Sequence, residues 1–358
     1  MNLRRVRTFL ETLTLPAALL ALILTPQLAA NGVRSGLTLC ANVILPSLFP
    51  FFVCSGLLVE LGVCARLSQR LAGPAAALLH LPPQAGTAFL LGLAGGYPAG
   101  AQIVAGLYEK KQLRAGEAEH ALAVCNQAGP SFIFGVLGGA VFKSAAAGAF
   151  LYAVQLLSAL IICRLTGKKP RAAVMPPRGE EPESFAAAFA ASVQRAGWSA
   201  LRICMYVTVF SVVSAYALAL AGSALPDALR PAVLGALELS AGCAALADCG
   251  LSVNIKLMLA SMLLSFGGCS ILMQTEAAVQ ESGLRGKYLL PYKLLQAGAA
   301  GAISLPLSLL LHAERWCAPV LAGCGTLSLW RSGTLLLCTC ACLYLRKKYH
   351  SISARKYV

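Results

Sequence analysis

Charged residues are scarce in this chain. Asp, Glu, Lys and Arg make up 12% of its 358 residues, whereas a soluble domain carries about 25%. Hydrophobic residues make up 58%, and the mean hydropathy is +0.72. A water-soluble fold of this composition would need a core far too large for its charged surface. The composition therefore predicts an all-α polytopic protein whose first partner is the lipid bilayer.

The sequence also lacks the signatures of common enzymes. It contains no phosphate-cradling GxxxxGK(S/T), no HExxH and no nucleophile elbow. Its four histidines lie far apart, at His80, His120, His312 and His350. No CxxC pair occurs among the 14 cysteines, and Cys inside an apolar run behaves as a small hydrophobic side chain. We therefore expect no catalytic residue, no metal and no cofactor.

Positive charge is in excess, with a net charge of +15. It gathers in short clusters between apolar runs, at Arg4–Arg7, Arg66–Arg70, Lys110–Arg114, Arg164–Arg178 and Arg346–Lys356. Basic loops resist translocation and stay in the cytoplasm. The pattern predicts a multi-pass protein of the cell (inner, cytoplasmic) membrane with both termini in the cytoplasm. It does not indicate a nucleic-acid partner.

About 20 apolar residues are needed for one membrane span. Candidate spans lie at 9–29, 37–60, 118–142, 145–164, 199–222, 231–250, 288–311 and 329–346. The first follows a basic start that resembles a signal peptide, but further spans follow at once, so we expect an uncleaved helix within 1–30. Two more apolar pieces, 84–107 and 255–275, are broken by glycines. Counting them as re-entrant hairpins leaves eight spans and keeps the basic clusters inside, and counting them as spans moves some clusters outside.

The chain divides into two halves of similar size. Its one substantial hydrophilic stretch, 165–184, is rich in prolines and mixed charges and is typical of a cytoplasmic linker. We expect one gate-like repeat at 31–164, a second at 185–345 and a basic cytoplasmic tail at 346–358.

Four short motifs recur in order in the two halves. Gly95-Gly96, Gln102, "QLR" (112–114) and "NQAG" (126–129) match Gly267-Gly268, Gln274, "GLR" (283–285) and "LQAG" (295–298), at offsets of 172, 172, 171 and 169. Many secondary transporters are built from duplicated halves, with the site where the halves meet. Both "LR" loops are basic, which hints at parallel halves, but inverted halves and chance matching in a Gly/Ala/Leu-rich chain stay open.

The stretch "GLAGGYPAGAQ" (92–102) lies in 38 uncharged residues and yet cannot form a regular helix. Irregular backbone at membrane depth survives only inside protein or beside a watery cavity. Glycine permits a tight reversal and proline removes a donor, so the motif predicts a helix break whose free backbone groups face a solute. The candidate site residues here are Gly95, Gly96, Tyr97, Pro98 and Gln102. The alternative is close helix packing through Gly92, Gly96 and Gly100.

The stretch "NQAGPSFIFG" (126–135) places three polar side chains at membrane depth, those of Asn126, Gln127 and Ser131. An amide side chain in lipid must face protein or water. Because Gly129-Pro130 follows, a broken helix with a solute site is one interpretation. Hydrogen bonds between helices, of structural value only, are the other.

Two further motifs complete the candidate site. Glu238 in "ELSAG" is a carboxylate within the weakest span, where it could bind a cation, carry a proton or accept hydrogen bonds from a solute. The alternative is a span end with the carboxylate reaching water. "SFGGCSILMQ" (265–274) is the counterpart of the first break, and its candidate residues are Gly267, Gly268, Ser270 and Gln274.

Taken in this order, the four motifs resemble the sporulation integral membrane protein family called YlbJ. The likeness covers about residues 30–345. It implies a polytopic membrane protein of an endospore-forming bacterium that is needed for spore cortex formation. The family is related to the nucleoside-recognition or gate-domain proteins, among them spore maturation proteins A and B, and this kinship implies transport. Ala128 departs from the pattern, in which Ser or Thr precedes the Gly-Pro.

The resulting hypothesis is a transporter-like gate protein that binds or moves a small polar solute. Further partners would be other sporulation membrane proteins or a second copy of the chain. A rival hypothesis is a scaffold for cortex assembly that transports nothing. A third is an intramembrane enzyme acting on lipid-linked precursors, for which Glu238 and Asp248 are the only candidate acids.

Overall fold

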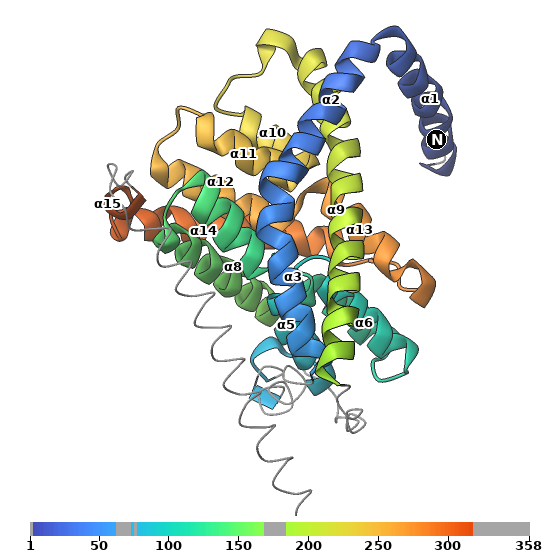
Figure 1. The fold of residues 1–358 in the computed structure, drawn as a ribbon, viewed down its shortest axis with the longest axis vertical. Coiled ribbons are helices and arrows are strands. Elements are labelled where there is room, and N and C mark those ends of the chain that lie inside the picture. Colours follow the sequence, from blue (N-terminus) through green and yellow to red (C-terminus); the bar gives the residue numbers. More distant parts are fainter. Residues whose placement is uncertain (1–2, 62–72, 75–76, 168–183, 318–358) are drawn as a thin grey trace, which may run out of the picture. The chain divides into compact units, whose positions relative to one another are not determined.

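Every regular element is a helix in the part of the chain that the computed structural model describes, residues 3–61, 73–74, 77–167 and 184–317. The predicted span at 329–346 and the basic tail lie outside the described residues, as does nearly all of the linker. The helices, in chain order (Figure 1), are α1 (Leu3–Leu24), α2 (Pro26–Leu39), η1 (Cys40–Ile44), α3 (Leu45–Glu60), α5 (Pro83–Gly95), α6 (Ala99–Glu109), α7 (Ala115–Cys125), η2 (Ser131–Val141), α8 (Ala145–Thr166), α9 (Phe185–Ala221), η3 (Gly222–Ala224), α10 (Arg230–Leu237), α11 (Leu239–Asp248), α12 (Val253–Phe266), α13 (Gly268–Val279), η4 (Gln280–Ser282), α14 (Leu289–Leu310) and α15 (Ala313–Cys317).

Five stretches of the described chain are long and apolar enough to cross a membrane. They are Pro26–Cys54, Ala145–Thr166, Phe185–Ala221, Val253–Val279 and Leu289–Leu310. One of them, Val253–Val279, covers the piece predicted as a hairpin at 255–275. The predicted total of eight spans and the re-entrant paths stay predictions.

The helices α2 and α3 run beside α9 along most of its length (Figure 1). Two glycines one helical turn apart make this contact close. A Cβ added to Gly32 would lie 2.7 Å from the Cα of Val212, and one on Gly36 would lie 2.8 Å from the Cα of Thr208. Since residue numbers rise on one helix as they fall on the other, the two helices are antiparallel. This is the small-residue packing that brings helices together in membranes.

The same contact corrects two predicted boundaries. The spans predicted at 9–29 and 37–60 correspond to separate helices, but the second begins earlier: helix runs without interruption from Pro26 to Glu60, because the glycines pack against α9 instead of forming a loop. The span predicted at 199–222 also begins earlier, since α9 starts at Phe185.

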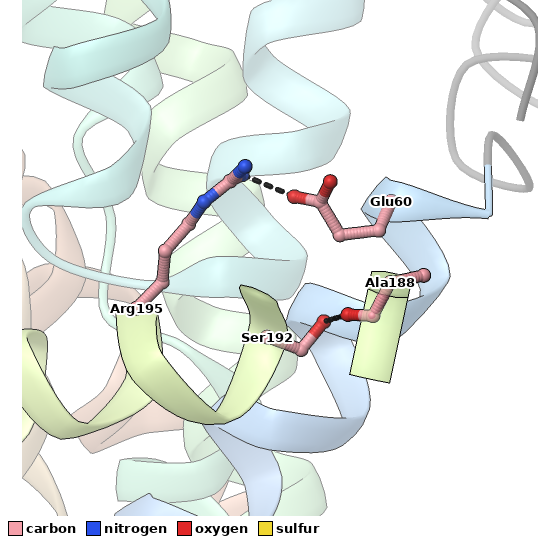
Figure 2. A network of polar contacts seen from close by, with 4 residues as sticks. All are labelled: Glu60, Ala188, Ser192 and Arg195. Carbon is pink, nitrogen blue, oxygen red and sulfur yellow. Dashed lines mark hydrogen bonds and ion pairs between the residues drawn. The ribbon is translucent and has the colours of Figure 1, made fainter. Parts of the chain in front are cut away.

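One ion pair joins the end of α3 to the first part of α9 (Figure 2): the guanidinium of Arg195 pairs with the carboxylate of Glu60. Within α9, Ser192 donates its hydroxyl proton to the carbonyl of Ala188, with 2.7 Å between the oxygens. A Cβ on Gly56 would lie 3.4 Å from the Cβ of Ser192, so the helices remain close to this end.

Four of the places that interrupt a helix within an apolar run of the described chain fall on the sequence motifs. They lie at 96–98 between α5 and α6, at 126–130 between α7 and η2, at Glu238 between α10 and α11, and at Gly267 between α12 and α13. Each falls on one of the four motifs. The two glycine-rich motifs and "NQAGP" therefore break helices as predicted, and "ELSAG" proves to be a fourth break.

Candidate solute site

The first break is built on glycines that touch the end of α7. Gly96 has φ +73°, a backbone conformation that glycine adopts readily. A Cβ added to Gly96 would lie 2.8 Å from the backbone N of Gly129. Cβ atoms on Gly92 and Gly100 would lie 2.3 and 2.0 Å from the carbonyl oxygen of Cys125. The break and the close-packing alternative are thus both present, and together they bring "GGYP" against "NQAGP".

Tyr97 joins this break to its counterpart in the second half. Its hydroxyl donates to the carbonyl of Leu264, with 2.9 Å between the oxygens. A Cβ on Gly267 would lie 3.6 Å from Cζ of Tyr97, and Gly267 itself has φ +88°. The two glycine breaks therefore lie against one another.

A small, partly open cavity lies where these breaks meet. Its volume is about 50 Å³, and on this measure about 10–15 Å³ holds one water molecule. Six of the predicted site residues line it, together with the backbone of Gly129 and the side chains of Ser240, Leu48, Phe52, Phe132, Ile203, Val207, Leu239 and Ile271. The six are Gly95, Gly96, Tyr97, Ser131, Glu238 and Gln274.

Glu238 is the one acidic residue among the described residues of the cavity wall. It is non-helical, with φ −141° and ψ 119°, and its carboxylate accepts a hydrogen bond from the backbone N–H of Ala241, 2.7 Å away. This caps α11, whose N-terminus favours negative charge. The side chain is 2% exposed, so the alternative in which it reaches water at a span end is wrong. Among the described residues it has no ion-pair partner.

Asn126 and Gln127 lie in a polar cluster next to the cavity instead of in its wall. Asn126 donates from its side-chain nitrogen to the hydroxyl of Thr275, 2.7 Å away. Gln127 and Gln296 exchange two amide hydrogen bonds, with N···O distances of 3.2 and 2.9 Å. Gln127 and Gln296 are the matching glutamines of "NQAG" and "LQAG", so matched positions of the two halves pair directly. Both side chains are fully buried.

The chain is 26% identical over 332 residues to "Sporulation integral membrane protein YlbJ" of Bacillus subtilis (strain 168), and the match covers 83% of this chain and 81% of that protein. The resemblance to the YlbJ family is confirmed. No family model matches the chain, and no solved structure matches it. The similarity and the five apolar helices together support a multi-pass sporulation membrane protein.

Lys293 lies beside the candidate site, and the sequence analysis missed it. It lies on α14, and its side chain is 1% exposed. Its ammonium donates to the carbonyl oxygen of Asn126 and lies 3.4 Å from the side-chain oxygen of Gln296. It also lies 5.3 Å from the centre of the Tyr97 ring. A lysine inside the span predicted at 288–311 was the available signal, because ionisable groups at membrane depth are rarely without a role.

Gln155 on α8 was missed as well. Its side-chain nitrogen donates to the carbonyl of Ala128, 2.9 Å away, within the break after α7. The side-chain oxygens of Gln155 and Asn126 are buried and have no hydrogen-bond partner among the described residues. Two buried acceptors near the break after α7 are therefore unpaired among the described residues.

The remaining predicted residues do not line the cavity. Gln102 is exposed on α6 and is not part of the cavity wall, so its assignment to the site stays a prediction without support from this geometry. Pro98 caps α6. Gly268 packs against α10, since its Cβ would lie 2.8 Å from the carbonyl oxygen of Gly235. Ser270 accepts a hydrogen bond from the side chain of Gln274, 3.2 Å away.

Proposed function

We propose that this YlbJ relative is a transporter-like gate protein that binds or moves a small polar solute in spore cortex formation. The observation that carries the proposal is the cavity between the two glycine breaks, with the buried carboxylate of Glu238 in its wall. A buried charge inside a membrane protein is costly and commonly marks a solute or ion pathway. Backbone that leaves the helix at membrane depth is tolerated beside such a pathway.

The chemistry of the wall supports a polar occupant. Glu238, Ser131 and Ser240 contribute hydrogen-bonding groups to a wall whose other side chains are mostly apolar. The side-chain oxygens of Asn126 and Gln155, outside that wall, are buried without a hydrogen-bond partner among the described residues. A cavity of about 50 Å³ holds a few waters, so a larger solute requires the breaks to move apart. We take this arrangement as a closed state of the gate.

The wider setting is part of the same proposal. The protein resides in the inner membrane with its termini and basic clusters in the cytoplasm, as the charge distribution favours. It performs no covalent chemistry, and its partners are the bilayer, other sporulation membrane proteins or a second copy of the chain. The two halves act as repeats, and the pairing of Gln127 with Gln296 at matched positions supports this.

Glu238→Gln tests the proposal, with Glu276→Gln as the matched control. Glu276 is an exposed carboxylate on α13 and lies outside the cavity wall. The purified full-length protein in liposomes is screened for uptake of nucleosides, amino acids and divalent metals. We expect wild type and Glu276→Gln to take up one solute class equally, and Glu238→Gln to take it up at least about tenfold more slowly.

Sporulating cells provide the second half of this test. At matched protein levels, Glu238→Gln and Asn126→Ala should give spores without normal cortex, whereas Glu276→Gln should complement fully. Normal cortex in both site variants, together with no uptake in liposomes, would favour the scaffold. An accumulating lipid-linked precursor in both Glu238→Gln and Asp248→Asn would favour the enzyme.

A further inference from the structure

The break after α7 leaves one buried carbonyl without its helical donor. In a continuous helix the carbonyl of residue 126 would accept from the N–H of residue 130. Residue 130 is proline, which has no N–H. Asn126 is fully buried, and a buried carbonyl must find a partner elsewhere.

Lys293 supplies that partner from another helix. Its ammonium donates to the carbonyl of Asn126, and no carboxylate of the described chain forms an ion pair with it. Burying an ammonium inside a membrane span is unfavourable unless its protons are taken up by acceptors. The ammonium of Lys293 therefore finds an acceptor at the break, and the carbonyl of Asn126 finds a donor in Lys293.

The same ammonium touches the wall of the cavity. It lies 5.3 Å from the ring centre of Tyr97, within the range of an attractive cation–π contact. The hydroxyl end of Tyr97 is held by the carbonyl of Leu264, and its ring lines the cavity. Lys293 does not itself line the cavity, so it acts on the solute site through Asn126 and Tyr97.

We infer that Lys293 is a positioning residue of the solute site, which holds the break after α7 closed and presses Tyr97 into the cavity wall. Without the ammonium, the carbonyl of Asn126 is orphaned and Tyr97 loses its partner on one side. Residues 125–130 then open to solvent. The link to the solute rests on the proposed function, whereas closure of the break does not.

Native cysteines report on the break without any solute. Cys125 directly precedes Asn126 and is 0% exposed, Cys243 on α11 is also 0% exposed, and Cys269 on α13 is exposed. The full-length protein in detergent is treated with N-ethylmaleimide, and labelling of each cysteine is followed by peptide mass spectrometry. In Lys293→Met we expect Cys125 to label at least about tenfold faster than in wild type, with Cys243 still protected and Cys269 labelled at the same rate.

Lys256→Met is the matched control. Lys256 also donates to a backbone carbonyl, that of Ala247 at 3.2 Å, but near the start of α12 and away from the break. It should leave the labelling of Cys125 unchanged. Unchanged Cys125 labelling in Lys293→Met, with Cys243 protected, would overturn the inference.

Pro130→Ala identifies the interaction that is lost. It restores an N–H at position 130 that can donate to the carbonyl of Asn126. The loss of melting temperature caused by Lys293→Met should therefore be at least halved in the Pro130→Ala background. Equal losses in both backgrounds overturn the inference, as does a double variant that fails to fold.

Solute uptake separates this inference from the proposed function. If the uptake screen finds a solute, Lys293→Met should raise its KM several-fold and Lys256→Met should not. An unchanged KM in Lys293→Met would contradict the positioning role. If the screen finds none, the proposed function fails, and the cysteine labelling still decides whether Lys293 closes the break.

Discussion

The segments "NQAG" at 126–129 and "LQAG" at 295–298 occupy matching places in the two halves but differ in backbone structure. The first is a break between α7 and η2, whereas the second lies within the continuous helix α14. Pro130 follows the first, and Ala299 stands at the matching place after the second. Pro130 removes an N–H from the first segment only, which favours a break there.

The two segments contribute different hydrogen-bonding groups. The broken segment offers free carbonyls, those of Asn126 and Ala128. The unbroken helix offers the donors, since Lys293 on α14 takes the first of these carbonyls and Gln296 pairs with Gln127. If the proposed repeat is real, two similar sequences contribute differently to one asymmetric site.

Ala299→Pro tests most directly whether proline causes the difference between the two segments. Proline at this position removes the N–H that bonds the carbonyl of Leu295 and places a ring against the preceding turn, which costs about 3 kcal/mol or more inside a helix. Ala299→Gly is the control, because it lowers helix propensity by only about 1 kcal/mol. Thermal unfolding in detergent should show a large drop for the first variant and a small one for the second. If Ala299→Pro and wild type have the same melting temperature, the proline does not explain why the two segments differ.

The sequence predicted the places of the breaks better than their surroundings. Glycine and proline act on the local backbone, so "GGYP", "NQAGP" and "SFGGC" could be identified from the sequence alone. Which side of a helix faces the cavity depends on its neighbours, and for that reason Gln102 was assigned to the site although it is exposed. The predicted spans left out Gly32 and Gly36, because their role in close helix packing is visible only when α9 lies against them.

Lys293 was missed for a related reason. It lies five residues after the start of the span predicted at 288–311, where a lysine can reach water along the helix. Only the fold shows that Asn126 and Tyr97 surround it instead. Glu238 was found because an acid within an apolar run has no such ready explanation.

Removing the hydrogen bonds between Gln127 and Gln296 should cause an intermediate loss of stability. Gln127→Leu or Gln296→Leu leaves the partner amide buried with fewer hydrogen bonds, which should lower the free energy of unfolding by about 1–3 kcal/mol each. Because both changes remove the same contact, the double variant should lose clearly less than the sum of the two. Gln102→Leu, at an exposed position, should change little. Strictly additive losses would show that the matched glutamines do not depend on each other.

The smallest effect should come from the far end of α3, where Glu60 and Arg195 pair (Figure 2). The Arg195 side chain is 67% exposed, and an exposed ion pair contributes about 0–1 kcal/mol that salt screens further. Glu60→Gln should therefore lower the melting temperature slightly in 50 mM salt and still less in 500 mM. The contacts of Gly32 and Gly36 with α9 remain in this variant and keep the helices together. A loss as large as that of Gln127→Leu, persisting at high salt, would mean that the surface pair holds the helices together as strongly as the buried polar contacts do.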